Sequence, residues 1–174
     1  QPPDELRRQR QMCIRDRINS VCKKNNLGIH MDGARIWNSI VAKKDDPELY
    51  GIYFDTMSVC LSKGLGCPIG SVLLGKKQYM DKAIRIRKIL GGGMRQSGYL
   101  AAAGLFALEN NISRLSEDHF RAKEIASKFL DKSFVKKIND VETSIIIIEL
   151  NEGVSKKTII DYFSKNDVVF DWYS

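Results

Sequence analysis

The stretch FDTMSVCLSKGLGCPIGSVLL, residues 54–74, decides the fold of this chain. It predicts a strand over 54–61, a glycine-rich loop that begins beside Lys63, and a second strand over 71–74. Glycines next to a lysine let a bulky planar ligand approach the backbone closely. The sequence therefore predicts a lysine at the end of a strand, in a position suited to ligand binding.

Further elements are predicted on both sides of this stretch. The central strands alternate with helical segments, which is typical of an α/β fold. Before residue 54 we expect a helix over 4–26, a strand over 29–31 that ends at Asp32, and a helix over 34–42. After residue 74 we expect helices over 76–90, 97–110, 112–131 and 156–165, and strands over 141–150 and 168–170. A shift in composition near 113–120 predicts a domain boundary.

The composition excludes several classes of protein. The chain has 174 residues, of which 43% are hydrophobic, and no apolar run is long enough to cross a membrane. The N-terminus shows no signal-peptide pattern. Four cysteines lack the spacing of a zinc site, so no metal is expected, and they fit a reducing compartment. We therefore expect a cytoplasmic protein that does not contact a membrane.

The net charge of +7 is concentrated in one segment. Residues 76–95 hold seven basic residues and one acid, so this segment carries nearly all of the excess. A nucleic-acid surface usually adds aromatic platforms or a known module, and only Tyr79 is interleaved here. Nucleic-acid binding is thus the less favoured interpretation. The nearby run 70–77 is not a phosphate-binding P-loop, because Lys77 stands where Ser or Thr must bind magnesium.

Two predicted strand ends carry candidate site residues. Asp32 follows His30 by two positions, so both side chains lie on one face of their strand. Ligands of open α/β sheets bind at the carboxyl ends of strands, where Asp32 and Lys63 stand. A lysine that is desolvated at such a place becomes a nucleophile. Spacing alone leaves open the alternative of a surface lysine beside a turn.

Three motifs in order make the pattern specific. They are HMDGAR at 30–35, SKGLGxPxGS at 62–71 and RKxxGGGMRQxG at 87–98. Together they resemble the low-specificity threonine aldolases, which are fold-type-I enzymes that use pyridoxal 5′-phosphate (PLP). The resemblance extends over about 18–150 and includes the later motif RLxEDH at 114–119. It implies the aspartate aminotransferase fold: a portion of the large PLP-binding domain over 18–114, then a linker helix and an incomplete small α+β domain over 115–174.

The resemblance also implies a role for each candidate residue. Lys63 would form the imine with PLP, and Asp32 would keep the pyridine nitrogen protonated. Arg35 would bind the substrate carboxylate, for which a guanidinium is suited. Lys88 and Arg95 would lie near a subunit interface and contribute to an active site near the phosphate or the substrate. His30 would either support the site or be a satisfied core histidine.

The implied reaction is the retro-aldol cleavage of L-threonine or L-allo-threonine to glycine and acetaldehyde, in a homodimer or homotetramer. A β-eliminating amino acid lyase of the same superfamily is the enzymatic alternative. A basic nucleic-acid-binding module and a non-catalytic fragment are the alternatives from other classes.

The resemblance further implies that the chain is a fragment, inactive by itself. Members of the family are much longer, and their upstream segments bind the phosphate and stack on the ring. The arginine-rich residues 1–17, with MCIRDR at 12–17, are interpreted as a doubtful, artefactual segment. Ser144 stands where the family often carries Asn, which predicts a local change in hydrogen bonding.

Overall fold

The structure is a computed structural model that describes residues 4–169. Its first part contains α1 (Asp4–Lys24), β1 (His30–Gly33), α2 (Ile36–Lys43), α3 (Glu48–Tyr53), β2 (Thr56–Cys60) and β3 (Ser71–Gly75). Its second part contains α4 (Lys77–Ile89), α5 (Gly98–Asn110), α6 (Leu115–Phe129), β4 (Val135–Ile138), β5 (Ile148–Leu150) and α7 (Lys156–Ser164). Two helices, α2 and α3, connect β1 to β2, as is typical of an α/β fold, whereas β2 is followed directly by β3.

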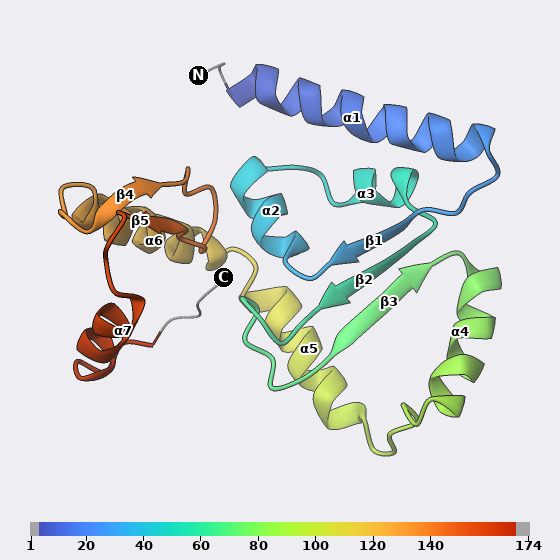
Figure 1. Cartoon of the computed structure of the whole chain (residues 1–174). Coiled ribbons are helices and arrows are strands. Elements are labelled where there is room, and N and C mark those ends of the chain that lie inside the picture. The colour runs from blue at the N-terminus through green and yellow to red at the C-terminus, as the bar shows by residue number, and fades with distance from the viewer. Residues whose placement is uncertain (1–3, 170–174) are drawn as a thin grey trace.

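A three-stranded sheet in the order β1-β2-β3 forms the centre of the molecule (Figure 1). β1 and β2 are parallel, with His30 opposite Thr56 and Asp32 opposite Ser58. β3 runs antiparallel to β2. The carboxyl ends of β1 and β2 therefore meet at one edge of the sheet, which is where the sequence places the candidate site.

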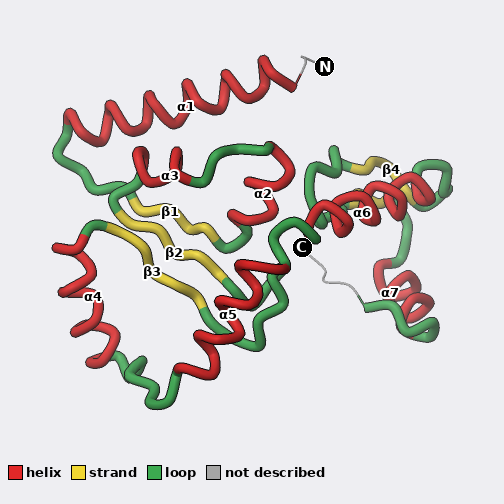
Figure 2. Tube along the Cα trace, turned by 180° about the vertical axis from the view of Figure 1, so that it is seen from behind, coloured by secondary structure: helices red, strands yellow, loops and turns green. Residues whose placement is uncertain are grey.

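Apolar side chains pack on one face of this sheet. Ile36, Ile40 and Tyr50 are buried together with Val59 of β2, and Met31 and Met57 pack against them. Side chains alternate along a strand, so Met31, Met57 and Val59 share the face that α2 covers. Both views show α1 and α3 beyond β1 and α4 beyond β3 (Figures 1 and 2).

A second core cluster lies beside the loop that follows β2. Leu65, Cys67, Ala107 and Leu115 are buried in it, and Leu65 and Leu115 are 2% and 0% exposed. These residues come from the loop, α5 and α6. The loop after Lys63 is thus anchored by the packing of its own apolar side chains against two helices.

The elements after α5 are the helices α6 and α7 and the strands β4 and β5. Helix α6 packs against α2, while β4 and β5 form an antiparallel pair beside α6 (Figure 1). Phe129 makes an edge contact with Phe134 and a tilted ring contact with Phe163, each at a centroid distance of 6.2 Å. The mixture of helices with an antiparallel pair has the α+β character expected after residue 115. The placement of the domain boundary stays a prediction.

Most of the predicted elements are confirmed within a few residues, but four details were wrong. The predicted strand over 141–150 is formed only at Ile148–Leu150, because its partner β4 is four residues long. β4 was missed, since Lys136 and Lys137 interrupt its apolar pattern. α3 was missed as well, although Pro47 at its N-cap and Glu48 in its first turn are typical helix-start residues. In the predicted strand 168–170, residues 168 and 169 are not in a strand, and Phe170 lies outside the described residues.

Within residues 4–169, none of the helices has the length and apolar character that a membrane crossing needs.

Candidate active site

A polar face of the sheet carries the candidate site. His30 and Asp32 point away from the core residue Met31, because side chains alternate along β1. Partners in a parallel register share a face, so Thr56 and Ser58 of β2 lie beside His30 and Asp32. Neighbouring strands are about 4.8 Å apart, so these four side chains form one polar patch. This face is opposite the one that α2 covers.

Asp32 is exposed and has a fixed orientation. Its Oδ1 accepts a hydrogen bond from the backbone N–H of Ala34 at 3.0 Å. This short side-chain-to-backbone bond is an Asx turn, which reverses the chain between β1 and α2. One carboxylate oxygen is therefore used to shape the turn.

Lys63 lies on the same face as Asp32. Its Nζ is 3.6 Å from Cys60 Sγ. Cys60 is two residues beyond Ser58 on β2, so its side chain projects on the Asp32 face. The amine of Lys63 therefore lies at the carboxyl end of β2, near this polar patch. Lys63 is exposed in this chain, so the buried environment considered for it is not formed here.

His30 and Arg35 lie beside these two residues. His30 is exposed and its Nδ1 is 2.8 Å from Thr56 Oγ1, so the alternative of a core histidine is wrong for this structure. Arg35 is exposed at the N-cap position of α2, three residues after Asp32. Its guanidinium is thus available at the same edge of the sheet as Asp32.

The structure does not bring Lys88 and Arg95 to this edge. Lys88 is in the last turn of α4, and Arg95 is in the exposed loop between α4 and α5. Figures 1 and 2 show this loop at the N-terminal end of α5, whereas Leu65 contacts Asn111 at the C-terminal end. Helix α5 has 13 residues and is about 20 Å long. Within this chain, the loop after Lys63 contacts the middle of α5, where Cys67 Sγ is 3.7 Å from Ala103 O, and its C-terminal end, whereas Arg95 precedes its N-terminal end.

Sequence analysis missed a buried polar cluster behind the lysine. Asn38 of α2 and His119 of α6 are 4% and 7% exposed. Asn38 Nδ2 is 3.2 Å from His119 Nε2 and donates to Ser144 Oγ at 3.2 Å. An amide nitrogen only donates, so His119 Nε2 accepts and is unprotonated. Two signals in the sequence pointed to this cluster: His119 belongs to the RLxEDH motif, and Ser144 stands where the family often carries Asn.

Burial lowers the pKa of His119 from its ordinary value of 6.5. The Asp118 carboxylate raises this pKa in part, and Lys123 lowers it further. The low pKa agrees with the accepting role of the ring nitrogen, because both require a neutral imidazole. The cluster is therefore a neutral polar core that joins α2 to α6 and to residue 144.

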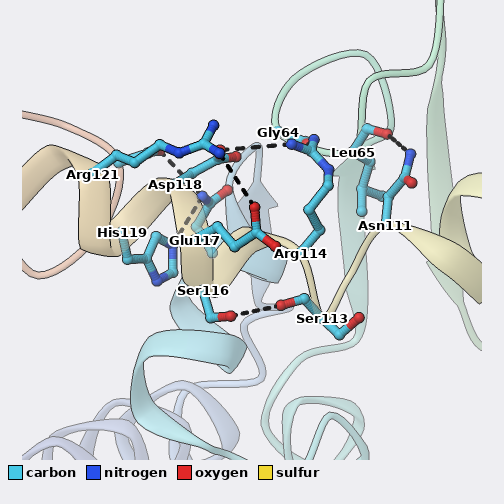
Figure 3. A network of polar contacts seen from close by, with 12 residues as sticks. Gly64, Leu65, Asn111, Ser113, Arg114, Ser116, Glu117, Asp118, His119 and Arg121 are labelled. Atoms are coloured by element: carbon cyan, nitrogen blue, oxygen red, sulfur yellow. Dashed lines mark hydrogen bonds and ion pairs between the residues drawn. The ribbon is translucent and has the colours of Figure 1, made fainter.

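The start of α6 also contacts the loop that follows Lys63 (Figure 3). Asn111 Nδ2 donates to Leu65 O at 2.7 Å, and Arg114 Nη2 donates to Gly64 O at 3.5 Å. Neither contact was predicted, because the partners are 46 and 50 residues apart in the sequence.

The described residues contain no group of three or more His, Cys, Asp or Glu side chains arranged to hold a metal ion.

The fold matches a known class of proteins. A crystal structure from Listeria monocytogenes EGD-E, provisionally named an L-allo-threonine aldolase, superposes with a TM-score of 0.70 at 23% identity. The match covers 77% of this chain and 38% of that one, and it shows the α/β fold. The sequence model of the beta-eliminating lyase family matches residues 11–152, and the chain belongs to this family.

Two curated relatives have a more specific name. The low specificity L-threonine aldolase of Escherichia coli strain K12 is 52% identical over 106 residues, which are 61% of this chain and 32% of that protein. The low-specificity L-threonine aldolase of Candida albicans is 40% identical over 134 residues, which are 77% of this chain and 36% of that protein. The chain thus spans about a third of the length of these relatives.

Proposed function

We propose that this chain is part of a longer protein, called the parent protein below, that cleaves L-threonine or L-allo-threonine to glycine and acetaldehyde. The observation that carries this proposal is the placement of Asp32 and Lys63 on one face of the sheet, at the ends of adjacent parallel strands. The names of the two curated relatives supply the substrate.

The cofactor of the proposed reaction is PLP. Asp32 and Lys63 fit this cofactor, because they offer, on the same face of the sheet, a carboxylate for a ring nitrogen and a primary amine for a carbonyl carbon. When bound, PLP supplies the electron sink that accepts the charge released at Cα. The role of Lys63 is to hold the cofactor through its amine nitrogen. The role of Asp32 is to hold a proton at the ring nitrogen.

The remaining candidate residues act on the substrate and on assembly. Arg35, exposed beside Asp32, would bind the substrate carboxylate through its planar fork of N–H donors. His30 would contribute to the same polar face. Lys88 and Arg95 would serve the site of another protomer in a homodimer or homotetramer, near the phosphate or the substrate. The four free cysteines accord with a cytoplasmic location for the parent protein.

The decisive experiment uses the parent protein and its Lys63→Ala variant. We expect the wild type to bind PLP and, after borohydride reduction, to carry the cofactor on the peptide that contains Lys63. The variant should lose this label and the release of glycine from threonine. Lys77→Ala is the matched control, because Lys77 is an exposed lysine on α4 that pairs with Asp81 at 3.3 Å. A label that persists in Lys63→Ala would contradict the assignment.

The description of the family favours one further candidate, a β-eliminating amino acid lyase. The same Lys63 and Asp32 would serve that reaction, in which the bond to a leaving group on Cβ breaks in place of the Cα–Cβ bond. Product analysis separates the two functions. Glycine and acetaldehyde support the aldolase, whereas pyruvate and ammonia support the eliminating lyase.

A further inference from the structure

The lysine loop, defined as Lys63–Gly70, is held by a side chain from outside the sheet. Asn111 Nδ2 donates to Leu65 O at 2.7 Å, two residues beyond Lys63 (Figure 3). Leu65 itself is 2% exposed, so its carbonyl lies against packed protein. The backbone N–H of Gly66 closes the turn by donating to Lys63 O at 2.8 Å. The hydrogen bond from Asn111 therefore links this tight turn to the end of α5, and it is shorter than the 3.5 Å contact that Arg114 Nη2 makes with Gly64 O of the same turn.

Gly64, in the same turn, lies against buried side chains. A Cβ on Gly64 would lie 2.9 Å from Leu115 Cδ2 and 3.1 Å from Asn38 Oδ1. Leu115 is fully buried, and the amide nitrogen of Asn38 is directed at His119 and Ser144. The amide oxygen of Asn38 is thereby directed at Gly64. The turn that follows Lys63 therefore contacts this wall through Gly64 and contacts Asn111 through the carbonyl of Leu65.

These two contacts of the turn determine where the amine of Lys63 can be. A lysine side chain has several rotatable bonds and, being exposed here, is not fixed by packing. Its reach is consequently set by the backbone from which it starts. Asn38 belongs to α2, which begins just after Asp32, so the wall also relates the Lys63 backbone to the strand end that carries Asp32. A misplacement of about 1 Å between reacting groups can lower a rate about 100-fold.

We propose that Asn111 is a positioning residue for Lys63. It acts through the carbonyl of Leu65 and holds the turn that follows Lys63 against the wall formed by Asn38 and Leu115. The inference rests on the proposed function, because it assumes that Lys63 is the amine that holds the cofactor. It adds a residue on the linker between α5 and α6 that contacts neither Lys63 nor Asp32.

The test compares two adjacent asparagines in the parent protein. Asn111→Asp keeps the shape of the side chain but replaces the donor by an oxygen that faces the Leu65 carbonyl. Asn110→Asp is the matched control. It adds the same charge one residue earlier, where the Asn110 amide is exposed and donates to Phe106 O of its own helix at 2.8 Å.

We expect Asn111→Asp to lower kcat for threonine cleavage about 10- to 100-fold with KM changed less than threefold. We also expect it to lower the rate at which PLP and borohydride label Lys63. Asn110→Asp should stay within twofold of the wild type in both measurements. Asn111→Ala, compared with Asn110→Ala, removes the donor without adding a charge and repeats the test if the aspartate variant does not fold.

The outcomes separate the two levels of the argument. A wild-type parent protein that is not labelled at Lys63 overturns the proposed function and, with it, this inference. A labelled wild type, with Asn111 variants that match their Asn110 controls in labelling rate and kcat, overturns the positioning role alone. A loss of unfolding free energy in the Asn111 variants, with unchanged labelling and kcat, shows a structural role and also overturns it.

Discussion

Two glycine-rich segments of this chain carry basic residues, and the structure treats them differently. The lysine loop contains Gly64, Gly66 and Gly70, and the segment 91–98, called the arginine loop, contains four glycines around Arg95. In the lysine loop, Leu65 and Cys67 are buried against α5 and α6. In the arginine loop every residue is exposed, and Met94 is 65% exposed. Similar composition therefore gives one segment that is positioned by this chain and one that is not.

The hydrogen bonds of the two loops show the same difference. Leu61 N donates to Gly70 O at 2.9 Å and thus joins the two ends of the lysine loop across the strand pair. In the arginine loop, Gly91 N and Gly92 N donate to Lys88 O and Arg87 O, which belong to the helix just before it. The lysine loop is tied to distant parts of the chain, whereas the arginine loop is tied to its own helix. This supports the proposal that Arg95 acts in an assembly with another protomer.

The largest predicted effect comes from removing the wall behind the lysine loop. Leu115→Ala deletes a side chain that is 0% exposed, which should lower the free energy of unfolding by about 2–5 kcal/mol. Leu90→Ala, next to the arginine loop, deletes a side chain that is 80% exposed and should cost less than about 0.5 kcal/mol. Urea unfolding of the 174-residue chain, followed by circular dichroism, measures both. Equal losses would contradict the contrast between the loops.

A smaller effect is expected from adding one methyl group to each loop. Gly64→Ala places a Cβ within 2.9 Å of Leu115 Cδ2 and should lower the unfolding free energy by about 1–3 kcal/mol. Gly93→Ala is the matched control, because the nearest atom to its Cβ is Lys88 Cγ at 3.6 Å, an ordinary contact with a flexible side chain. Its effect should lie within about 0.5 kcal/mol. The same urea titration checks the pair, and a tolerated Gly64→Ala would mean that the wall yields.

The elements that position the site could be predicted because their signals are local. The strand that ends at Asp32, the loop at Lys63 and the helix that begins after Arg35 each follow from a few adjacent residues. The parallel pairing of β1 and β2 then brings Asp32 and Lys63 to one edge. Local pattern is sufficient here, because ligand-binding residues of α/β sheets stand at strand ends.

The contacts that hold the site could not be predicted in the same way. Asn38 meets His119 across 81 residues and Ser144 across 106 residues, and no spacing rule relates such positions. The short length of β5 likewise depends on its partner β4 and not on its own β-branched sequence. Of the four cysteines, Cys67 is the buried one because it packs against α5, a contact that no local pattern predicts. In each case the deciding residue is distant in the sequence.

The smallest predicted effect is a pH dependence that comes from the buried side of the lysine loop. The native pKa of His119 lies below its ordinary value of 6.5, so the unfolded chain takes up a proton first as the pH falls. The contribution of His119 to stability is therefore complete above about pH 6.5 and is lost as the pH falls from there through the native pKa. Asp118 opposes this shift and Lys123 strengthens it, but burial is the largest cause, so the pKa remains lowered.

Urea unfolding at pH 7.5 and 5.5 should show lower stability at the acidic value. His119→Gln should reduce that difference. An undiminished difference in His119→Gln would assign the pH dependence to other groups.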